Sequence, residues 1–120
     1  MAKQRLDIKT LDRFVRTLAI FRAIQERFAI QQMQVLIAVA QLEQRSGGQG
    51  AASQQEIAKT LDLPQSTTSR NLADLAGFRT LTSTPFVRVY ENPMNRREKL
   101  VNLTPAGEKL VQQVISILEG

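Results

Sequence analysis

Two short helical segments separated by a tight turn constrain the fold of this chain more than any other feature of its sequence. Ser53 followed by Glu56 is the signature of a capping box, which predicts the start of a helix at that point. The sequence Asp62-Leu63-Pro64 ends this helix, because proline cannot continue it. A second helix is expected over about Gln65–Ala76, with Gly77 as its C-terminal stop. The pattern is therefore two short helices joined by a turn.

The small and apolar residues near the turn are those of a helix-turn-helix. Ala58 stands where the first helix would cross the second, and Leu63 would fill the gap between the helices. In this motif the exposed face of the second helix enters the major groove of DNA. The side chains expected on that face are those of Gln65, Ser66, Thr67, Ser69, Arg70 and Asn71. The Gln, Asn and Arg side chains among them can pair bidentately with adenine or guanine.

The alternative is that Gln65–Ser69 is only the polar, solvated start of a helix. Serine and threonine are poor residues inside a helix, so a cluster of four of them needs a reason. Contact with base edges, and of the N–H groups at the helix start with phosphate, supplies such a reason. The DNA interpretation becomes the stronger one when the next segment is considered.

A change of hydrophobic period at Phe86 predicts a β-hairpin. Phe86–Glu91 and Lys99–Leu103 are rich in β-branched and aromatic residues, which indicates two strands, and Asn92–Glu98 between them indicates a polar turn. The residues of the hairpin expected to contact DNA are Arg88, Asn95, Arg96, Arg97 and Lys99. The two adjacent arginines at the tip would reach the backbone or a neighbouring minor groove. In an isolated hairpin, these arginines would be explained as charges that keep an exposed turn soluble. Directly after a helix-turn-helix, contact with DNA is the favoured explanation.

Longer helices flank these elements. An amphipathic helix is expected over Leu6–Phe28, a largely buried one over Gln31–Gln44, and a last one after the N-cap and proline of Thr104-Pro105. Gly47, Gly48 and Gly50 predict a loop after the second helix, with a short strand at Ala51–Ala52.

The first helix would be about 30 Å long, and one chain of this size offers too little surface to cover its apolar stripe. A second copy of the chain would cover it, which predicts a dimer. The expected dimerisation residues are Leu11, Phe14, Leu18, Phe21, Val114, Ile117 and Leu118. A basic helix lying on a membrane surface is the alternative, but burial in a protein interior explains the aromatic stripe adequately.

The composition limits the other functions. Sixteen Lys and Arg against 11 Asp and Glu give a net charge of +5, and the absence of Cys and His excludes disulfides, Cys/His metal sites and a histidine base. No Gly-rich phosphate loop or nucleophile motif is present. The longest apolar run, Val35–Ala40, is far too short to span a bilayer, and nothing resembles a signal peptide. We therefore expect a cytoplasmic protein that is not an enzyme, with no cofactor, no metal and no membrane contact.

From Gln54 to Leu118 the sequence resembles the winged-helix regulators of the MarR type. The matching segments are Glu56–Leu63, Ser66–Leu72, Asn95–Arg97 and Leu103–Gly107. The last is the most specific, because the family typically passes from its wing into the C-terminal helix through Leu-Thr-Pro-x-Gly. The resemblance implies a homodimer built from the terminal helices, with a recognition helix in the major groove and a wing beside it. It also implies transcriptional regulation, most often repression, and it leaves room for a small aromatic effector, which no residue of the sequence supports.

The sequence thus predicts a mainly α fold with a small β-hairpin, a winged helix-turn-helix with long N- and C-terminal dimerisation helices. One domain would span residues 1–120, with dimerisation helices at 6–45 and 104–120, the helix-turn-helix at 53–76 and the wing at 86–103. The expected function is sequence-specific binding of double-stranded DNA by a homodimeric repressor. Two alternatives stay open, namely a winged helix that binds another protein and a DNA-binding protein of replication or partitioning.

Overall fold

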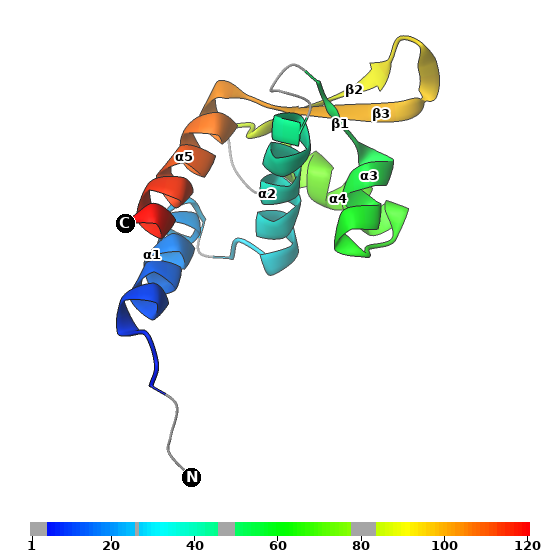
Figure 1. Ribbon diagram of the computed structural model, residues 1–120. Helices are drawn as coiled ribbons and strands as arrows, with labels where there is room; N and C mark the ends of the chain where they lie inside the picture. The colour runs from blue at the N-terminus through cyan, green and yellow to red at the C-terminus, as the bar shows by residue number, and fades with distance from the viewer. Residues whose placement is uncertain (1–4, 26, 46–49, 78–83) are drawn as a thin grey trace.

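The computed structural model describes residues 5–25, 27–45, 50–77 and 84–120. Its elements are α1 (Ile8–Ile24), α2 (Ile30–Arg45), β1 (Ala52–Ser53), α3 (Gln54–Leu61), α4 (Gln65–Leu75), β2 (Val87–Asn92), β3 (Asn95–Leu103) and α5 (Pro105–Glu119). Figure 1 shows α1 and α5 side by side at one end, α3, α4 and the β2–β3 hairpin at the other, and α2 between them. This is a winged helix-turn-helix fold, mainly α with a small antiparallel sheet, as the sequence predicts.

Helix α2 forms the centre of the core. Val35, Leu36 and Val39 have no exposed surface, and the helix packs against α3, α4, α5 and the sheet. Being surrounded, the helix carries apolar residues on most of its sides. Its bounds differ by one residue at each end from the expected Gln31–Gln44.

Helix α1 is shorter than the expected Leu6–Phe28. At its start the Asp7 carboxylate accepts hydrogen bonds from the hydroxyl (2.8 Å) and the backbone N–H (3.2 Å) of Thr10. These two bonds, the hydroxyl bond first, lower the pKa of Asp7. At the other end the backbone becomes extended, and the ring of Phe28 packs edge-on against that of Phe21 with centroids 5.1 Å apart. The aromatic stripe therefore continues past the end of the helix, because Phe28, in the segment after α1, is also buried.

The helix-turn-helix forms as its capping residues predict. Ser53 Oγ accepts the N–H of Glu56 (3.0 Å), and the Glu56 carboxylate accepts the N–H of Ser53 (3.3 Å), which completes the capping box of α3. Asp62 in the turn adopts the left-handed conformation (φ +54°), which aspartate tolerates better than most residues. Ala58, expected at the crossing of the helices, is buried, and Gly77 (φ +83°) follows the end of α4.

The wing belongs to a three-stranded antiparallel sheet of order β1-β3-β2, not to a hairpin alone. Strand β1 pairs Ser53 with Leu100 and lies one residue later than the expected Ala51–Ala52. Of the preceding glycines expected to form a loop, Gly47 and Gly48 lie outside the described residues. Strand β1 attaches the wing directly to the start of α3, because α3 begins at the residue that follows β1.

The turn of the hairpin is tighter than the predicted Asn92–Glu98. Asn92 pairs with Asn95, so that Pro93-Met94 alone lies between the strands. A register shift between Glu91 and Asn92 takes up the extra residues of β3. The prediction was wrong because the paired residues here are polar and carry no hydrophobic alternation.

The passage from the wing into α5 is fixed by Thr104. Its hydroxyl oxygen accepts the N–H of Gly107 (3.1 Å) as an N-cap and donates to the carbonyl of Pro85 (2.7 Å). Its backbone N–H donates to the carbonyl of Phe86 (3.0 Å), and Pro105 occupies the first helical position. The start of α5 is thereby tied to the segment that leads into β2.

Candidate nucleic-acid interface

The exposed face of α4 carries four of the side chains expected to contact bases. Gln65, Ser66, Ser69 and Arg70 are all exposed, and their spacing places them on one face of the helix. Thr67 beside them is half-buried. The N-cap is a proline without a side-chain cap, so the N–H groups of the first turn are available to an anion such as phosphate.

Asn71 lies on the inward face of α4, not on the exposed face as predicted. It is buried, and its amide donates a hydrogen bond to Oε1 of Gln31 on α2 at 3.4 Å. Thr68 is also buried, and its hydroxyl donates to the carbonyl of Pro64 at 3.1 Å. The helical period placed Asn71 at the edge of the polar face, and the position of α2 decides on which side of that edge it falls.

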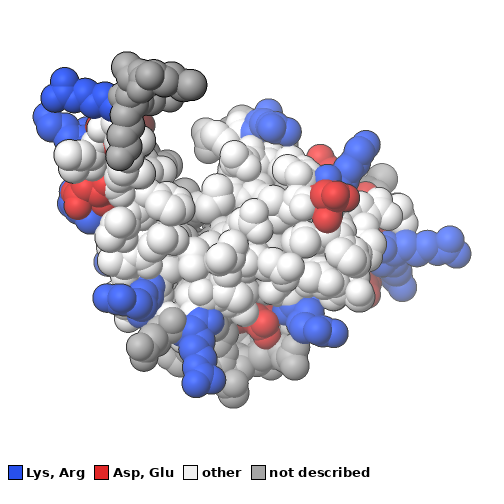
Figure 2. Space-filling model, turned by 90° about the horizontal axis from the view of Figure 1, so that it is seen from below, with Lys and Arg blue, Asp and Glu red and all other residues white. Residues whose placement is uncertain are grey.

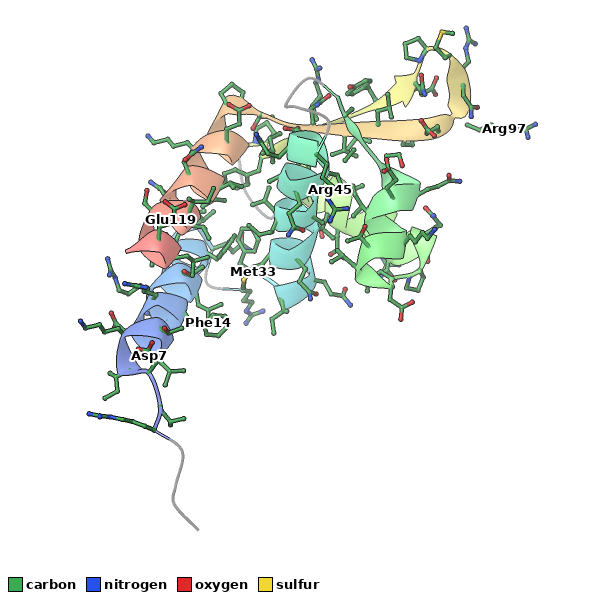
Figure 3. All side chains as sticks on the ribbon, viewed as in Figure 1. Asp7, Phe14, Met33, Arg45, Arg97 and Glu119 are labelled. Carbon is green, nitrogen blue, oxygen red and sulfur yellow. The ribbon has the colours of Figure 1, made fainter. Side chains whose placement is uncertain are left out.

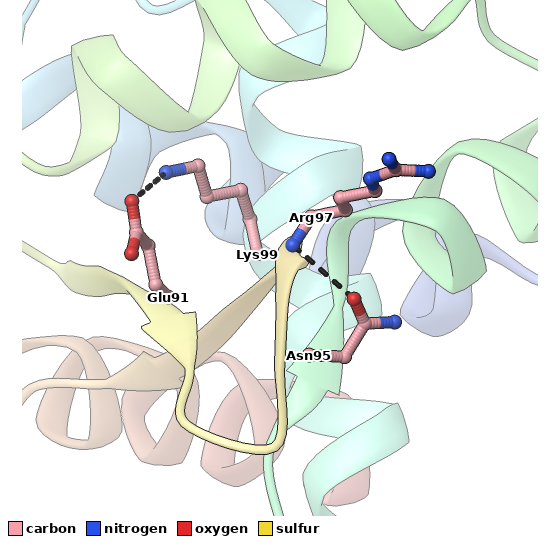
Figure 4. A network of polar contacts seen from close by, with 4 residues as sticks. All are labelled: Glu91, Asn95, Arg97 and Lys99. Atoms are coloured by element: carbon pink, nitrogen blue, oxygen red, sulfur yellow. Dashed lines mark hydrogen bonds and ion pairs between the residues drawn. The ribbon is translucent and has the colours of Figure 1, made fainter.

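Two asparagines hold the tip of the wing. Asn92 Oδ1 accepts the N–H of Met94 (3.0 Å), while the Asn92 amide donates to the Glu98 carboxylate (2.8 Å). Asn95 Oδ1 accepts the N–H of Arg97 (3.3 Å), as Figure 4 shows. The tip is therefore ordered by local side-chain bonds.

Arg96 and Arg97 lie on strand β3 beside the tip, not in a loop at the tip as predicted, and both are exposed. In Figure 3 the side chain of Arg97 extends outward on the side of the molecule opposite to Asp7 and Glu119. Lys99 forms an ion pair with Glu91 (3.4 Å), and Figure 4 shows Arg97 pointing away from this pair. Such an exposed pair contributes at most about 1 kcal/mol, so a phosphate can compete for Lys99.

Arg88 lies on the face of the hairpin opposite to Lys99. The register pairs Arg88 with Asn102 and Glu91 with Lys99, and alternate residues of a strand face opposite sides. The guanidinium carbon of Arg88 lies 5.0 Å from the centre of the Tyr90 ring, a cation–π arrangement. The structure therefore does not bring Arg88 and Lys99 together into one basic surface.

The root of the wing is fastened to α2 by Glu43. Its carboxylate accepts hydrogen bonds from the backbone N–H of Leu103 and from the amide of Asn102 (3.2 Å). Asn102 in turn accepts a hydrogen bond from the Tyr90 hydroxyl. Sequence reasoning did not identify Glu43, because its contact with Leu103 spans 60 residues and no local pattern marks it.

Exposed apolar side chains line α1 and the end of α5. They are Ile8, Leu11, Phe14, Val15, Leu18, Ile115 and Leu118. We call this set the apolar stripe. It contains four of the seven residues expected to form the dimer, and a fifth, Ile117, is half-buried.

Phe21 and Val114 differ from the other expected dimerisation residues. They are only 2% and 5% exposed, because they face the core of their own chain. Phe21 contacts Phe28, as described above. Both residues are therefore corrected to core positions. The helical period could not separate the residues that cover the chain's own core from those that remain exposed.

Figure 2 shows one face of the molecule, with Lys and Arg side chains projecting around its margin and a broad uncharged area between them. Within the described ranges, no group of three or more acidic, Cys or His residues is arranged to hold a metal ion. Among the helices of those ranges, none has the length and apolar character to cross a membrane.

No family model and no curated protein sequence matches this chain. Solved structures match its fold. BpsR of Bordetella bronchiseptica, whose DNA binding is described as regulated by 6-hydroxynicotinic acid, is 26% identical, with a TM-score of 0.58 over 91% of this chain and 74% of that chain. MepR of S. aureus, in a complex with DNA, is 23% identical, with a TM-score of 0.66 over 91% and 75%. A mutant of MarR from E. coli is 20% identical, with a TM-score of 0.59 over 98% and 79%. The chain therefore has the fold of the MarR-type regulators.

Proposed function

We propose that this protein is a transcriptional regulator of the MarR type that binds double-stranded DNA through α4 and the wing. The observation that carries the proposal is the exposed polar face of α4, the second helix of a helix-turn-helix. The hairpin of β2 and β3, whose strand β3 carries Arg96 and Arg97, lies at the same end of the molecule as α4, away from α1 and α5 (Figure 1). The DNA binding of BpsR and the DNA complex of MepR support the same function.

In the proposed complex the N-terminal half of α4 lies in the major groove. Arg70 is suited to a bidentate pair with guanine and Gln65 to one with adenine, while the serines offer short contacts. The first turn of α4 meets a phosphate. Arg96 and Arg97 contact the backbone or a narrow minor groove beside it, which positions the helix without reading the bases in the major groove.

We further propose that two copies of the protein join through the apolar stripe on α1 and α5. Water is removed from Leu11, Phe14, Leu18 and Leu118 when a second copy covers them, and burial of apolar surface is worth about 25 cal/mol per Å². A two-fold axis then presents two copies of α4 to half-sites about one helical turn apart. A dimer of this kind on a promoter excludes other proteins from it, which is the basis of the proposed repression.

Selection of bound fragments from a pool of random duplexes tests the proposal. We expect a two-fold symmetric site with half-sites about 10 base pairs apart. Affinity for any duplex should fall steeply as salt is raised, because several phosphate contacts release counterions. If no duplex is retained even at low salt, the DNA function is wrong and a protein-binding role takes its place. The genomic position of selected sites, in promoters or elsewhere, separates transcription from replication or partitioning.

A further inference from the structure

We propose that Gln32 is a positioning residue for the recognition helix α4, acting through Asp74 and not through contact with DNA. The inference rests on the proposed function, because it concerns how accurately α4 is presented to base edges. Gln32 lies in the first turn of α2 and is only 8% exposed. A buried polar side chain needs partners, and those of Gln32 lie in two different parts of the chain.

Both polar atoms of the Gln32 side-chain amide form hydrogen bonds. Its Oε1 accepts the backbone N–H of Ala29, which directly precedes α2, at 2.8 Å. Its Nε2 donates to Oδ2 of Asp74 on α4 at 3.0 Å, across 42 residues of sequence. A glutamine amide offers both an acceptor and donors, whereas a glutamate carboxylate offers acceptors alone. The same side chain therefore caps α2 and joins it to α4.

The position of Asp74 makes this link relevant to the bases. Asp74 follows Arg70 by one helical turn, so a rotation or slide of α4 that moves one carboxylate also redirects that guanidinium. Leu72 and Leu75 pack α4 onto the core, but apolar contact is non-directional and tolerates small slides. The hydrogen bond between Gln32 and Asp74 has a preferred distance and angle, and so fixes the rotation and the axial position of α4.

A second, weaker link supports the same arrangement. The amide of Asn71 donates to Gln31 at 3.4 Å, so adjacent glutamines of α2 hold successive turns of α4. This contact also accounts for the inward placement of Asn71. Two polar links between the same pair of helices fix their relative rotation better than one.

Three variants isolate the link. Gln32→Glu keeps the size of the side chain and the acceptor for Ala29, but sets a carboxylate against that of Asp74. Asp74→Asn is the matched control, because its amide oxygen can still accept from Gln32. The combination of the two restores a donor–acceptor pair with its direction reversed, since the amide introduced at position 74 can donate to the carboxylate introduced at position 32.

The measured quantity is the ratio of affinities for a duplex selected from the random pool and for an unrelated duplex of the same length. We expect Gln32→Glu to lower this ratio roughly tenfold, the size of a single lost base contact. Asp74→Asn and the double variant should keep the ratio of the parent protein. Hydrogen exchange of the α4 backbone amides should be faster in Gln32→Glu than in the other three proteins, while exchange in α5 stays the same.

The proposal is overturned if Gln32→Glu keeps the parent ratio at a temperature well below its unfolding transition, or if the double variant does not restore it. An Asp74→Asn variant as impaired as Gln32→Glu would also overturn it, because the loss would then belong to the charge of Asp74. If the parent protein binds neither duplex, the proposed function fails, and the exchange measurement still decides the positioning role. Equal α4 exchange in all four proteins would refute that role.

Discussion

The α-carbon of Gly107 lies against the backbone carbonyl of Phe86, and a methyl group on that carbon would overlap the carbonyl oxygen. The same oxygen accepts the N–H of Thr104 at 3.0 Å, so the segment before β2 cannot move aside without losing a hydrogen bond. Glycine is otherwise unfavourable inside a helix by about 0.5–1 kcal/mol relative to alanine. The close approach of two backbone segments explains why α5 has one in its first turn.

Replacing this glycine should destabilise the protein, although alanine is the better helix former. We expect Gly107→Ala to lower the free energy of unfolding by about 1–3 kcal/mol, the usual cost of overpacking. Urea unfolding followed by circular dichroism measures it. Ser116→Ala, at an exposed position of the same helix, is the control and should change the midpoint little. A midpoint for Gly107→Ala equal to or above that of the parent would contradict the structure.

The wing arginines should contribute to the affinity for DNA without contacting base edges in the major groove. We expect replacement of both Arg96 and Arg97 by alanine to weaken binding to every duplex and to reduce the slope of log affinity against log salt by about 2. Fluorescence anisotropy in a salt series measures this slope. Replacement of Arg22 and Lys109, exposed on α1 and α5, removes the same charge away from the proposed interface and should leave the slope unchanged. Equal slopes for the two double variants would show that the wing does not contact phosphate.

Arg70 should read one base step. We expect Arg70→Ala to cost about 1–3 kcal/mol with the selected duplex and to lose discrimination at a single position, while affinity for unrelated duplexes changes little. Titration of a set of singly substituted duplexes locates that position. Lys59→Ala, on the exposed side of α3, serves as the comparison and should keep the full discrimination. Uniform weakening across all duplexes would assign Arg70 to phosphate instead of to a base.

The apolar stripe should determine the oligomeric state. Phe14 is 58% exposed in the single chain, so a charge there costs little in the monomer but cannot be buried in a dimer. We expect the parent protein to sediment as a dimer at micromolar concentration and Phe14→Glu to sediment as a monomer with an unchanged unfolding midpoint. Ile30→Glu, at a position 72% exposed on α2 and outside the stripe, should remain a dimer. A monomeric parent protein would refute the proposed assembly.

Features encoded by neighbouring residues could be predicted from the sequence. The capping box at Ser53 and the N-cap at Thr104 both form where they were expected, because their hydrogen bonds link residues three apart. The exposed side chains at the start of α4 were found by the same local reasoning.

Features that depend on distant residues could not be predicted in this way. Gln32 and Glu43 each bond to residues more than 40 positions away, and neither stands out in its own helix. Phe21 and Phe14 share one amphipathic pattern, yet Phe21 is buried in the core cluster and Phe14 is exposed, a difference that depends on tertiary packing. The pairing of Asn92 with Asn95 was missed for a related reason, because polar strands lack the alternation that marks a register.

Ser53 belongs to two parts of the molecule at once, since it pairs with Leu100 of β3 and caps the first turn of α3. The strand that carries Arg96 and Arg97 is thus joined, without an intervening linker, to the helix pair that presents Arg70. A displacement of the wing must pull the helix pair with it. In the proposed complex with DNA, α4 and the wing of each protomer would therefore keep a fixed separation. In the proposed dimer, the distance between the two protomers would then be the adjustable quantity.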